Sequence, residues 1–178
     1  MIYYVKVFYP RMHSIIKHRD RMLRNINGIK DKILEMPDDP QKVVRMFAHY
    51  RLQYHLKKVL NISVLPDFSY NKNGKPYLKE YPDVHFNLSH TDSAIAFIIS
   101  DRVCGIDIEK RKNISNTLKN MPENPSEDFF DYWCKKECYV KFKGDNILKY
   151  LHKDIPKNLD FQKLEVREEF ICYYLEEK

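Results

Sequence analysis

Residues 94–109 read AIAFIISDRVCGIDIE, and the fold prediction begins from this stretch. The apolar run at 94–100 has the length and the β-branched content of a buried strand. A tight turn is expected at 101–102, and apolar and polar residues then alternate over 103–109. We therefore predict two strands that return on each other as a hairpin.

The second strand of this predicted hairpin carries two carboxylates. Side chains two residues apart on a strand face the same side, so Asp107 and Glu109 project together. Ile106 and Ile108 then face the core. Two carboxylates on one face suit Mg²⁺, which prefers one or two carboxylates together with phosphate and water. A solvated pair on an exposed sheet face is the other interpretation of this pattern.

Further helices and strands are predicted on both sides of this stretch. Residues 41–60 follow an Asp-Asp-Pro start and repeat their apolar positions at mostly helical spacing, which predicts the longest helix. The aromatic residues of 127–143 predict a second helix. The shorter predicted elements are a strand at 2–8, a turn at 71–76, a strand at 85–88, a loop or short helix at 110–128, and a hairpin within 161–175.

The composition favours a polyanionic partner, because the 178 residues carry a net charge of +6 with a pI of about 9.0. Nucleic acid, an acidic protein surface and a multiply phosphorylated cofactor all meet this condition. No apolar run approaches the roughly 20 residues that span a bilayer. The first residues also lack the pattern of a signal peptide. We therefore expect no membrane association.

The four cysteines predict a cellular compartment. Cys104, Cys134, Cys138 and Cys172 form no Cys-x-x-Cys pair, and the spacing of the middle two is weak evidence for zinc. We predict reduced structural thiols and therefore a cytoplasmic protein.

The second predicted helix supplies a third carboxylate. Glu137 and Lys141 are four residues apart and share one helical face, whereas Lys136 lies about 100° away. A surface Glu–Lys pair is the simpler interpretation of this spacing. Ser89 and His90 follow a predicted strand, where a histidine can bind phosphate, ligate a metal or cap a turn.

Four short sequence motifs, taken together, are far more specific than any of these signals alone. They are GKP at 74–76, FNLSH at 86–90, GIDIE at 105–109 and W-x2-KE-x3-K at 133–141. In this order they closely resemble the motif set of the Sfp-type phosphopantetheinyl transferases. The segment GKPYLKEYPDVHFNLSHT is especially similar to the corresponding part of that family. The resemblance covers residues from about 70 to 145, and four strings in the right order are highly specific.

The resemblance implies an α/β (α+β) fold with pseudo-twofold symmetry, in which two similar halves each pack a small antiparallel sheet on a long helix. The active site would lie in the cleft between the halves. We expect residues 1–178 to form a single catalytic unit, with an N-terminal half at about 1–100 and a C-terminal half at about 101–178. The second half is shortened relative to the family, which leaves carrier docking and pocket depth open.

The resemblance also implies roles for individual residues. Asp107, Glu109 and Glu137 would hold Mg²⁺ on the pyrophosphate of coenzyme A, with Glu137 either a third ligand or the base that activates the carrier serine. Lys141 would stabilise the pyrophosphate as its bond breaks, which makes Asp107, Glu137 and Lys141 the expected catalytic residues. The expected coenzyme A contacts are Arg45, Lys75, Ser89, His90, Lys136 and Lys141, with Lys30 and Lys32 as further candidates for the 3′-phosphate.

The activity implied by the resemblance is Mg²⁺-dependent transfer of 4′-phosphopantetheine from coenzyme A to a serine of an apo acyl or peptidyl carrier protein. The products would be the holo carrier and 3′,5′-ADP, and the enzyme would be a monomer of the holo-acyl-carrier-protein synthase type. Two alternatives stay open. One is a basic nucleic-acid-binding protein, based on the arginines and lysines of 11–24 and the many tyrosines, although no nucleic-acid-binding motif supports it. We expect no nucleic-acid partner. The other is a degenerate transferase that binds coenzyme A or a carrier without catalysis.

Overall fold

The computed structural model describes residues 1–115 and 127–178, which form helices and antiparallel sheets of the α+β class. Part of the loop or helix predicted at 110–128 lies outside these residues. Across the described ranges no helix is both long enough and apolar enough to cross a membrane. All four cysteines are free and buried.

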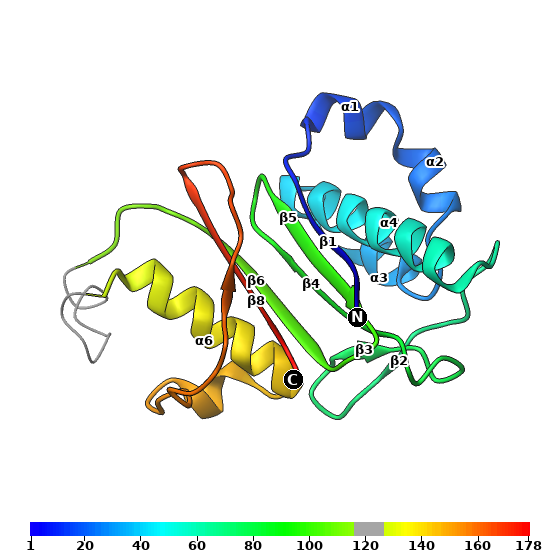
Figure 1. Cartoon of the computed structure of the whole chain (residues 1–178). Helices are drawn as coiled ribbons and strands as arrows, with labels where there is room; N and C mark the ends of the chain where they lie inside the picture. Colours follow the sequence, from blue (N-terminus) through cyan, green and yellow to red (C-terminus); the bar gives the residue numbers. More distant parts are fainter. Residues whose placement is uncertain (116–126) are drawn as a thin grey trace.

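Two three-stranded antiparallel sheets form the centre of the structure (Figure 1). The first has the order β1-β5-β4, with bounds Ile2–Phe8, Ile95–Ser100 and His85–His90. The second has the order β6-β8-β7, with bounds Cys104–Lys110, Phe170–Glu176 and Gln162–Lys163. The pairing of β7 with β8 confirms the predicted C-terminal hairpin. A small ribbon of β2 and β3 frames the turn predicted at 71–76, with bounds Ser69–Tyr70 and Pro76–Tyr77.

The hairpin predicted for residues 94–109 is wrong in its pairing. Both edges of β5 are occupied, by β1 on one side and by β4 on the other. No edge of β5 is left for β6, so the chain turns after β5 and enters the second sheet, where β6 pairs with β8. As a result β6 lies beside β4 at the junction of the two sheets.

Two long helices flank the sheets. The helix α4 (Pro40–Leu60) begins after Asp39, whose side chain accepts a hydrogen bond from the backbone of the first turn. The helix α6 (Phe129–Lys143) begins after Asp128, which caps it in the same way, and a 3₁₀ turn follows it at Ile147–Tyr150. Both helices confirm the predicted bounds to within two residues.

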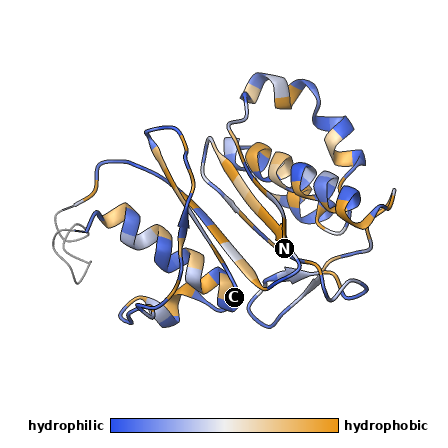
Figure 2. Cartoon of the chain, in the orientation of Figure 1, coloured by the Kyte–Doolittle hydropathy of each residue, from blue (hydrophilic) through white to orange (hydrophobic). Residues whose placement is uncertain are grey.

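These elements stack in the order helix, sheet, sheet, helix. On β5 the side chains of Ile95, Phe97 and Ile99 pack toward α4, whereas those of Ala96 and Ile98 pack against the second sheet. In Figure 2 the hydrophobic colour is concentrated on β5 and the strands next to it. The two sheets therefore share one apolar core, and α6 closes the outer side of the second sheet.

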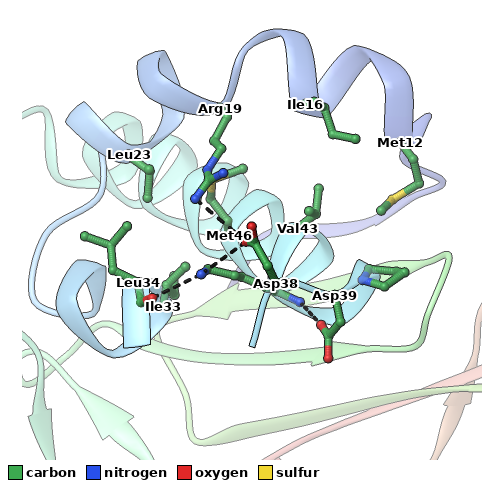
Figure 3. A pocket seen from close by; sticks show the side chains of 12 residues that line it. Met12, Ile16, Arg19, Leu23, Ile33, Leu34, Asp38, Asp39, Val43 and Met46 are labelled. Atoms are coloured by element: carbon green, nitrogen blue, oxygen red, sulfur yellow. Dashed lines mark hydrogen bonds and ion pairs between the residues drawn. The ribbon is translucent and has the colours of Figure 1, made fainter. Parts of the chain in front are cut away.

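Three short helices cover the outer side of α4: α1 (Met12–Lys17), α2 (Arg19–Arg24) and α3 (Lys30–Glu35). The basic stretch at 11–24 therefore forms helices that pack on α4. An apolar pocket of about 370 Å³ lies between these helices and the start of α4 (Figure 3). Its lining includes none of the acidic residues of β6.

Candidate functional site

The candidate site forms where α6 packs on β6, and Gly105 permits their close approach. A Cβ atom at Gly105 would lie 2.5 Å from the carbonyl oxygen of Cys138 and 2.6 Å from the backbone nitrogen of Phe142. Only glycine fits against the helix backbone at that distance. Asp107 and Glu109 follow at alternate positions of β6 on this same side, as the sequence predicted.

Glu137 of α6 meets the two carboxylates of β6. Asp107, Glu109 and Glu137 form an acidic cluster in which one carboxylate oxygen of each residue lies within 4.8 Å of the others. Asp107 is buried, at 1% exposure, and the other two residues are partly buried. The acidic pair is therefore not the solvated pair of the alternative interpretation.

The carboxylates of the acidic cluster repel one another, and a bound cation would relieve this repulsion. Burial and the neighbouring carboxylates of Asp107 and Glu137 raise the pKa of Glu109 to about 8. Burial and Asp107 also raise the pKa of Glu137, although hydrogen bonds from Trp133 and Lys141 act in the opposite direction. A bound divalent cation would favour the ionised form of all three carboxylates.

The two oxygens of Asp107 differ in their surroundings. Its Oδ1 accepts hydrogen bonds from Ser89 Oγ at 2.8 Å and from Lys141 Nζ at 2.5 Å. Its Oδ2 is buried and has no hydrogen-bond partner among residues 1–115 and 127–178. A buried carboxylate oxygen without a partner is costly unless a ligand binds it. Because Mg²⁺ takes oxygen ligands, the acidic cluster fits this metal.

Lys141 places a positive charge in direct contact with the acidic cluster. Its Nζ donates to Ser89 Oγ at 2.8 Å and lies 3.8 Å from the Glu137 carboxylate, in addition to its bond with Asp107. Burial lowers the pKa of Lys141, but the carboxylates of Asp107 and Glu137 outweigh this effect and raise it overall. Lys141 is therefore an ammonium ion held by two of the three acidic residues.

Side chains of β4 join the two sheets at the site. Asn87 Oδ1 accepts a hydrogen bond from the backbone nitrogen of Ile106 at 2.9 Å, and Ser89 Oγ lies 3.4 Å from that of Ile108. β4 and β6 belong to different sheets and share no backbone ladder, so these side-chain contacts connect the two strands. Sequence reasoning gave Asn87 no role, and the only signal for it was its place in the string FNLSH.

A pocket of about 300 Å³ opens beside the acidic cluster. Its lining includes the cluster itself, Lys141, Ser89 and His90, as well as the basic side chains of Lys110 and Lys112. Burial, followed by Arg45 and Lys141, lowers the pKa of His90. Arg45 is exposed on α4 and acts on His90, so the structure brings both predicted residues to this side of the molecule.

Two predicted coenzyme A contacts lie elsewhere. Lys75 Nζ donates to the carbonyl oxygens of Cys104 at 2.9 Å and Phe142 at 3.2 Å, so it links the turn before β3 to the end of α6. Neither Lys75 nor Lys136 lines the pocket beside the acidic cluster.

Lys136 points away from the acidic cluster. Its side chain is 1% exposed, and its Nζ donates to the Tyr132 hydroxyl at 2.7 Å and to the Leu151 carbonyl oxygen at 3.2 Å. The contacts of Lys75 and Lys136 with coenzyme A stay predictions.

The two further candidates for the 3′-phosphate lie on α3. Lys30 and Lys32 are exposed, and Lys32 Nζ lies 4.6 Å from the ring centroid of Tyr70. Tyr70 is also close enough to Arg45 for the guanidinium to act on its pKa. Lys32 therefore belongs to the same side of the molecule as Arg45.

Comparison with curated proteins finds relatives that are named 4′-phosphopantetheinyl transferases. The 4′-phosphopantetheinyl transferase of Bacillus subtilis is 30% identical over 94 residues, which cover 45% of this chain and 42% of the relative. The transferase psf-1 of Bacillus pumilus is 32% identical over 94 residues, with 45% and 40% covered. The transferase gsp of Aneurinibacillus migulanus is 32% identical over 110 residues, with 52% and 45% covered. The chain thus spans less than half the length of these relatives, and no protein-family model matches it.

Proposed function

We propose that this chain, which belongs to the Sfp-type 4′-phosphopantetheinyl transferase superfamily, transfers the 4′-phosphopantetheine arm of coenzyme A to a serine of an apo carrier protein. The observation that carries this proposal is the acidic cluster with the unpartnered Oδ2 of Asp107 beside the ammonium of Lys141. Such an arrangement would suit a divalent cation and a diphosphate bound next to each other.

Asp107 and Glu109 are the proposed ligands of Mg²⁺, and Glu137 completes the acidic cluster as the proposed base. The bound metal would neutralise the diphosphate oxygens and make 3′,5′-ADP a better leaving group. The chain's own part is to hold the three carboxylates on two packed elements, β6 and α6, so that they are in place before the substrate binds.

The proposed reaction is one displacement at phosphorus. The serine oxygen of the carrier attacks the phosphorus that bears the pantetheine arm, and a new P–O bond forms. The P–O bond to the bridging oxygen breaks, and 3′,5′-ADP leaves. Glu137 accepts the serine proton in this proposal. Lys141 offers positive charge to the departing phosphate, because its ammonium already lies at the acidic cluster.

The two halves are proposed to be related by a pseudo-twofold axis and to act as one catalytic unit. Each half contributes a three-stranded antiparallel sheet and one long helix, and the division falls in the turn at 101–102. The site lies at their junction, so a single chain supplies every proposed residue and a monomer is expected. The four reduced cysteines support a cytoplasmic location.

The proposed partner is an apo acyl or peptidyl carrier protein. A net charge of +6 suits both an acidic carrier surface and a cofactor with three phosphate groups. The nucleic-acid alternative is not favoured by the site, whose buried carboxylates would repel a phosphate backbone in the absence of a metal.

Intact mass spectrometry of several apo acyl and peptidyl carriers tests the proposal. Each carrier is incubated with this chain, coenzyme A and Mg²⁺, and EDTA is added to a parallel sample. We expect one carrier to gain a single phosphopantetheine arm, and we expect EDTA to prevent the gain. Asp107→Ala and Glu109→Ala should abolish both the gain and the Mg²⁺-dependent binding of coenzyme A. Asp160→Ala is the control that should behave as wild type, because Asp160 is exposed, pairs with Lys178 and Gln162, and is not part of the acidic cluster.

The alternatives give different outcomes in the same samples. Mg²⁺-dependent binding of coenzyme A without modification of any carrier would support a degenerate binder. Salt-sensitive binding of oligonucleotides without binding of coenzyme A would support the nucleic-acid protein. Full activity of Asp107→Ala would contradict the metal site itself.

A further inference from the structure

The strand β1 leaves one edge of the first sheet open. It pairs with β5 on one side, and on its other side no backbone hydrogen bond joins it to any of the described residues (Figure 1). The open edge of a strand presents N–H and C=O groups that can pair with an extended segment of another chain. β1 therefore has the backbone of a docking site, and its side chains decide what can dock.

Three positive side chains lie beside this edge and form what we call the basic patch: Lys6 of β1, and Arg51 and Lys58 of α4. Lys6 is exposed, and it lies opposite Phe97 on the face of the sheet that packs toward α4. Burial lowers the pKa of His55, and the charges of all three residues lower it further, although its hydrogen bond with the backbone of Arg51 acts in the opposite direction. The three charges are therefore close enough together to act on one buried ring.

The basic patch has no negative charge to balance it in the described part of the chain. None of its three residues forms an ion pair with a carboxylate there. The Cζ atom of Arg51 instead lies 4.2 Å from the ring centroid of Phe8, and its Nε is buried without a hydrogen-bond partner among the same residues. Lys58 Nζ lies 4.7 Å from the ring centroid of Tyr54. Because buried donors are nearly always paired, this arrangement favours a partner that brings acceptors and negative charge.

Two simpler explanations of the basic patch do not account for it. A lysine on an edge strand commonly protects the edge from aggregation, and Lys6 alone could be explained in this way. Arg51 and Lys58 belong to a helix, so protection of the strand edge does not explain them. Pairing of β1 with β1 of a second copy would bring two basic patches together, and like charges repel. The charges therefore select a strand that carries carboxylates.

The two faces of β1 define the side-chain pattern of such a strand. Lys6 lies on the face toward α4, whereas Val5 and Val7 pack against the apolar core between the two sheets. Successive residues of an added strand would alternate between the same two faces. A fitting segment thus has carboxylates at every second position, next to the basic patch, and apolar residues between them.

We propose that the open edge of β1 binds an acidic, extended segment of a partner protein, which extends the first sheet and pairs its carboxylates with the basic patch. Backbone hydrogen bonds would supply affinity, and the carboxylates would select the partner. The surface is separate from the pocket beside the acidic cluster, because none of the residues that line that pocket belongs to β1 or α4. The proposal goes beyond the proposed function and does not depend on it.

A synthetic peptide with capped ends tests the proposal. It has seven residues, the length of β1, and alternates glutamate with valine. Isothermal titration calorimetry with the full chain should show saturable binding, and hydrogen exchange should slow at the amides of β1. A peptide with lysine in place of glutamate should bind at least about tenfold more weakly, because like charges then meet. Methylation of two successive central amides keeps the charges but removes one N–H that faces β1, so it should also weaken binding.

Substitutions in the basic patch complete the test. Lys6→Glu, at an exposed position, should weaken binding of the glutamate peptide at least about tenfold and improve binding of the lysine peptide. Lys58→Glu should act in the same direction and carries the test if the first variant does not fold. Lys153→Glu, at an exposed lysine outside the basic patch, is the matched control and should bind as wild type.

Several results would overturn the proposed docking site. They are absence of binding, equal binding of the glutamate and lysine peptides, and protection from exchange outside β1. Dimerisation of the free chain that protects β1 would assign the edge to a second copy. Binding of a single-stranded oligonucleotide but not of the peptide, lost in Lys6→Glu, would assign the basic patch to nucleic acid.

Discussion

Ser89 is the small side chain on which the polar contacts of the site converge. Its Oγ donates to Asp107 Oδ1 and accepts from Lys141 Nζ, and it lies 3.4 Å from the backbone nitrogen of Ile108. A hydroxyl has one donor and two acceptor sites, so it can serve all three groups at once. Ser89 thereby links β4, β6 and α6 at one point beside the acidic cluster.

A substitution of Glu137 tests directly whether this residue is the general base. Glu137→Gln should lower the rate of transfer by about 10²–10⁴-fold, the usual contribution of a general base, while the affinity for coenzyme A changes little. Steady-state transfer and calorimetric binding measured on the same preparation provide the comparison. Glu127→Gln is the control, because Glu127 forms an ion pair with Lys135 and is not part of the acidic cluster. Equal losses of rate and affinity would make Glu137 mainly a metal ligand.

At the scale of elements, the turn at 71–75 holds the end of α6. Asn71 and Asn73 donate side-chain hydrogen bonds to the Gly144 carbonyl oxygen at 2.8 and 3.0 Å. Lys75 donates to the Phe142 carbonyl oxygen, close to the C-terminus of the helix, where a positive charge is favourable. The string GKP therefore sits in a turn that connects the two halves, whatever contact it makes with coenzyme A.

The close packing of α6 on β6 predicts what a single methyl group added at Gly105 would do. Gly105→Ala would place a Cβ within 3 Å of the α6 backbone, so the helix must move. Overpacking of this kind costs about 1–3 kcal/mol. We expect a lower melting temperature and weaker Mg²⁺-dependent binding of coenzyme A, because Lys141 on α6 would move away from Asp107.

Thermal unfolding and calorimetry measure these two effects of Gly105→Ala. Gly74→Ala provides a comparison, since a Cβ at Gly74 meets nothing within 4 Å and only its positive φ of 87° opposes the change. Gly74→Ala should therefore destabilise the fold without weakening coenzyme A binding through the acidic cluster. Unchanged binding by a folded Gly105→Ala protein would show that the cluster tolerates a shift of α6.

At the scale of the whole molecule, the lowered pKa of the buried His49 predicts how the stability of the fold depends on pH. The pKa of His49 falls from an ordinary value of 6.5 to about 3 in the fold, through burial and then through Arg45 and His90. Below pH 6.5 the unfolded chain takes up a proton at this residue while the folded chain does not. The free energy of unfolding should therefore fall, by up to about 1.4 kcal/mol per pH unit, as the pH drops from 6.5 toward 3.

Urea unfolding of wild type and His49→Gln at several pH values between 7 and 4.5 measures this slope. The variant should lose less stability than wild type as the pH falls, because it has removed one proton-binding group from the unfolded state. His152→Gln, at an exposed histidine, should follow wild type. Parallel curves for wild type and His49→Gln would show that His49 takes up its proton equally in both states.

The local periodicities in the sequence predicted most elements but could not predict their pairing. The spacing of apolar residues gave both long helices, and alternation on β6 placed Asp107 and Glu109 on one side. The pairing of β5 with β6 was wrong, because a turn of two residues is compatible with a hairpin and equally with passage to another sheet. Only the occupation of both β5 edges by β1 and β4 excluded the hairpin.

The sequence by itself determined the identity and order of the acidic and basic residues, because periods of two and 3.6 residues are local properties of strands and helices. It therefore predicted which carboxylates share a face. Only the tertiary structure decided which side chains from distant segments meet: the acidic cluster between β6 and α6, the two carbonyl contacts of Lys75, the burial of Lys136, and the unpaired nitrogen of His49. The physical reason is that burial and hydrogen-bond pairing depend on long-range packing, which no local pattern encodes.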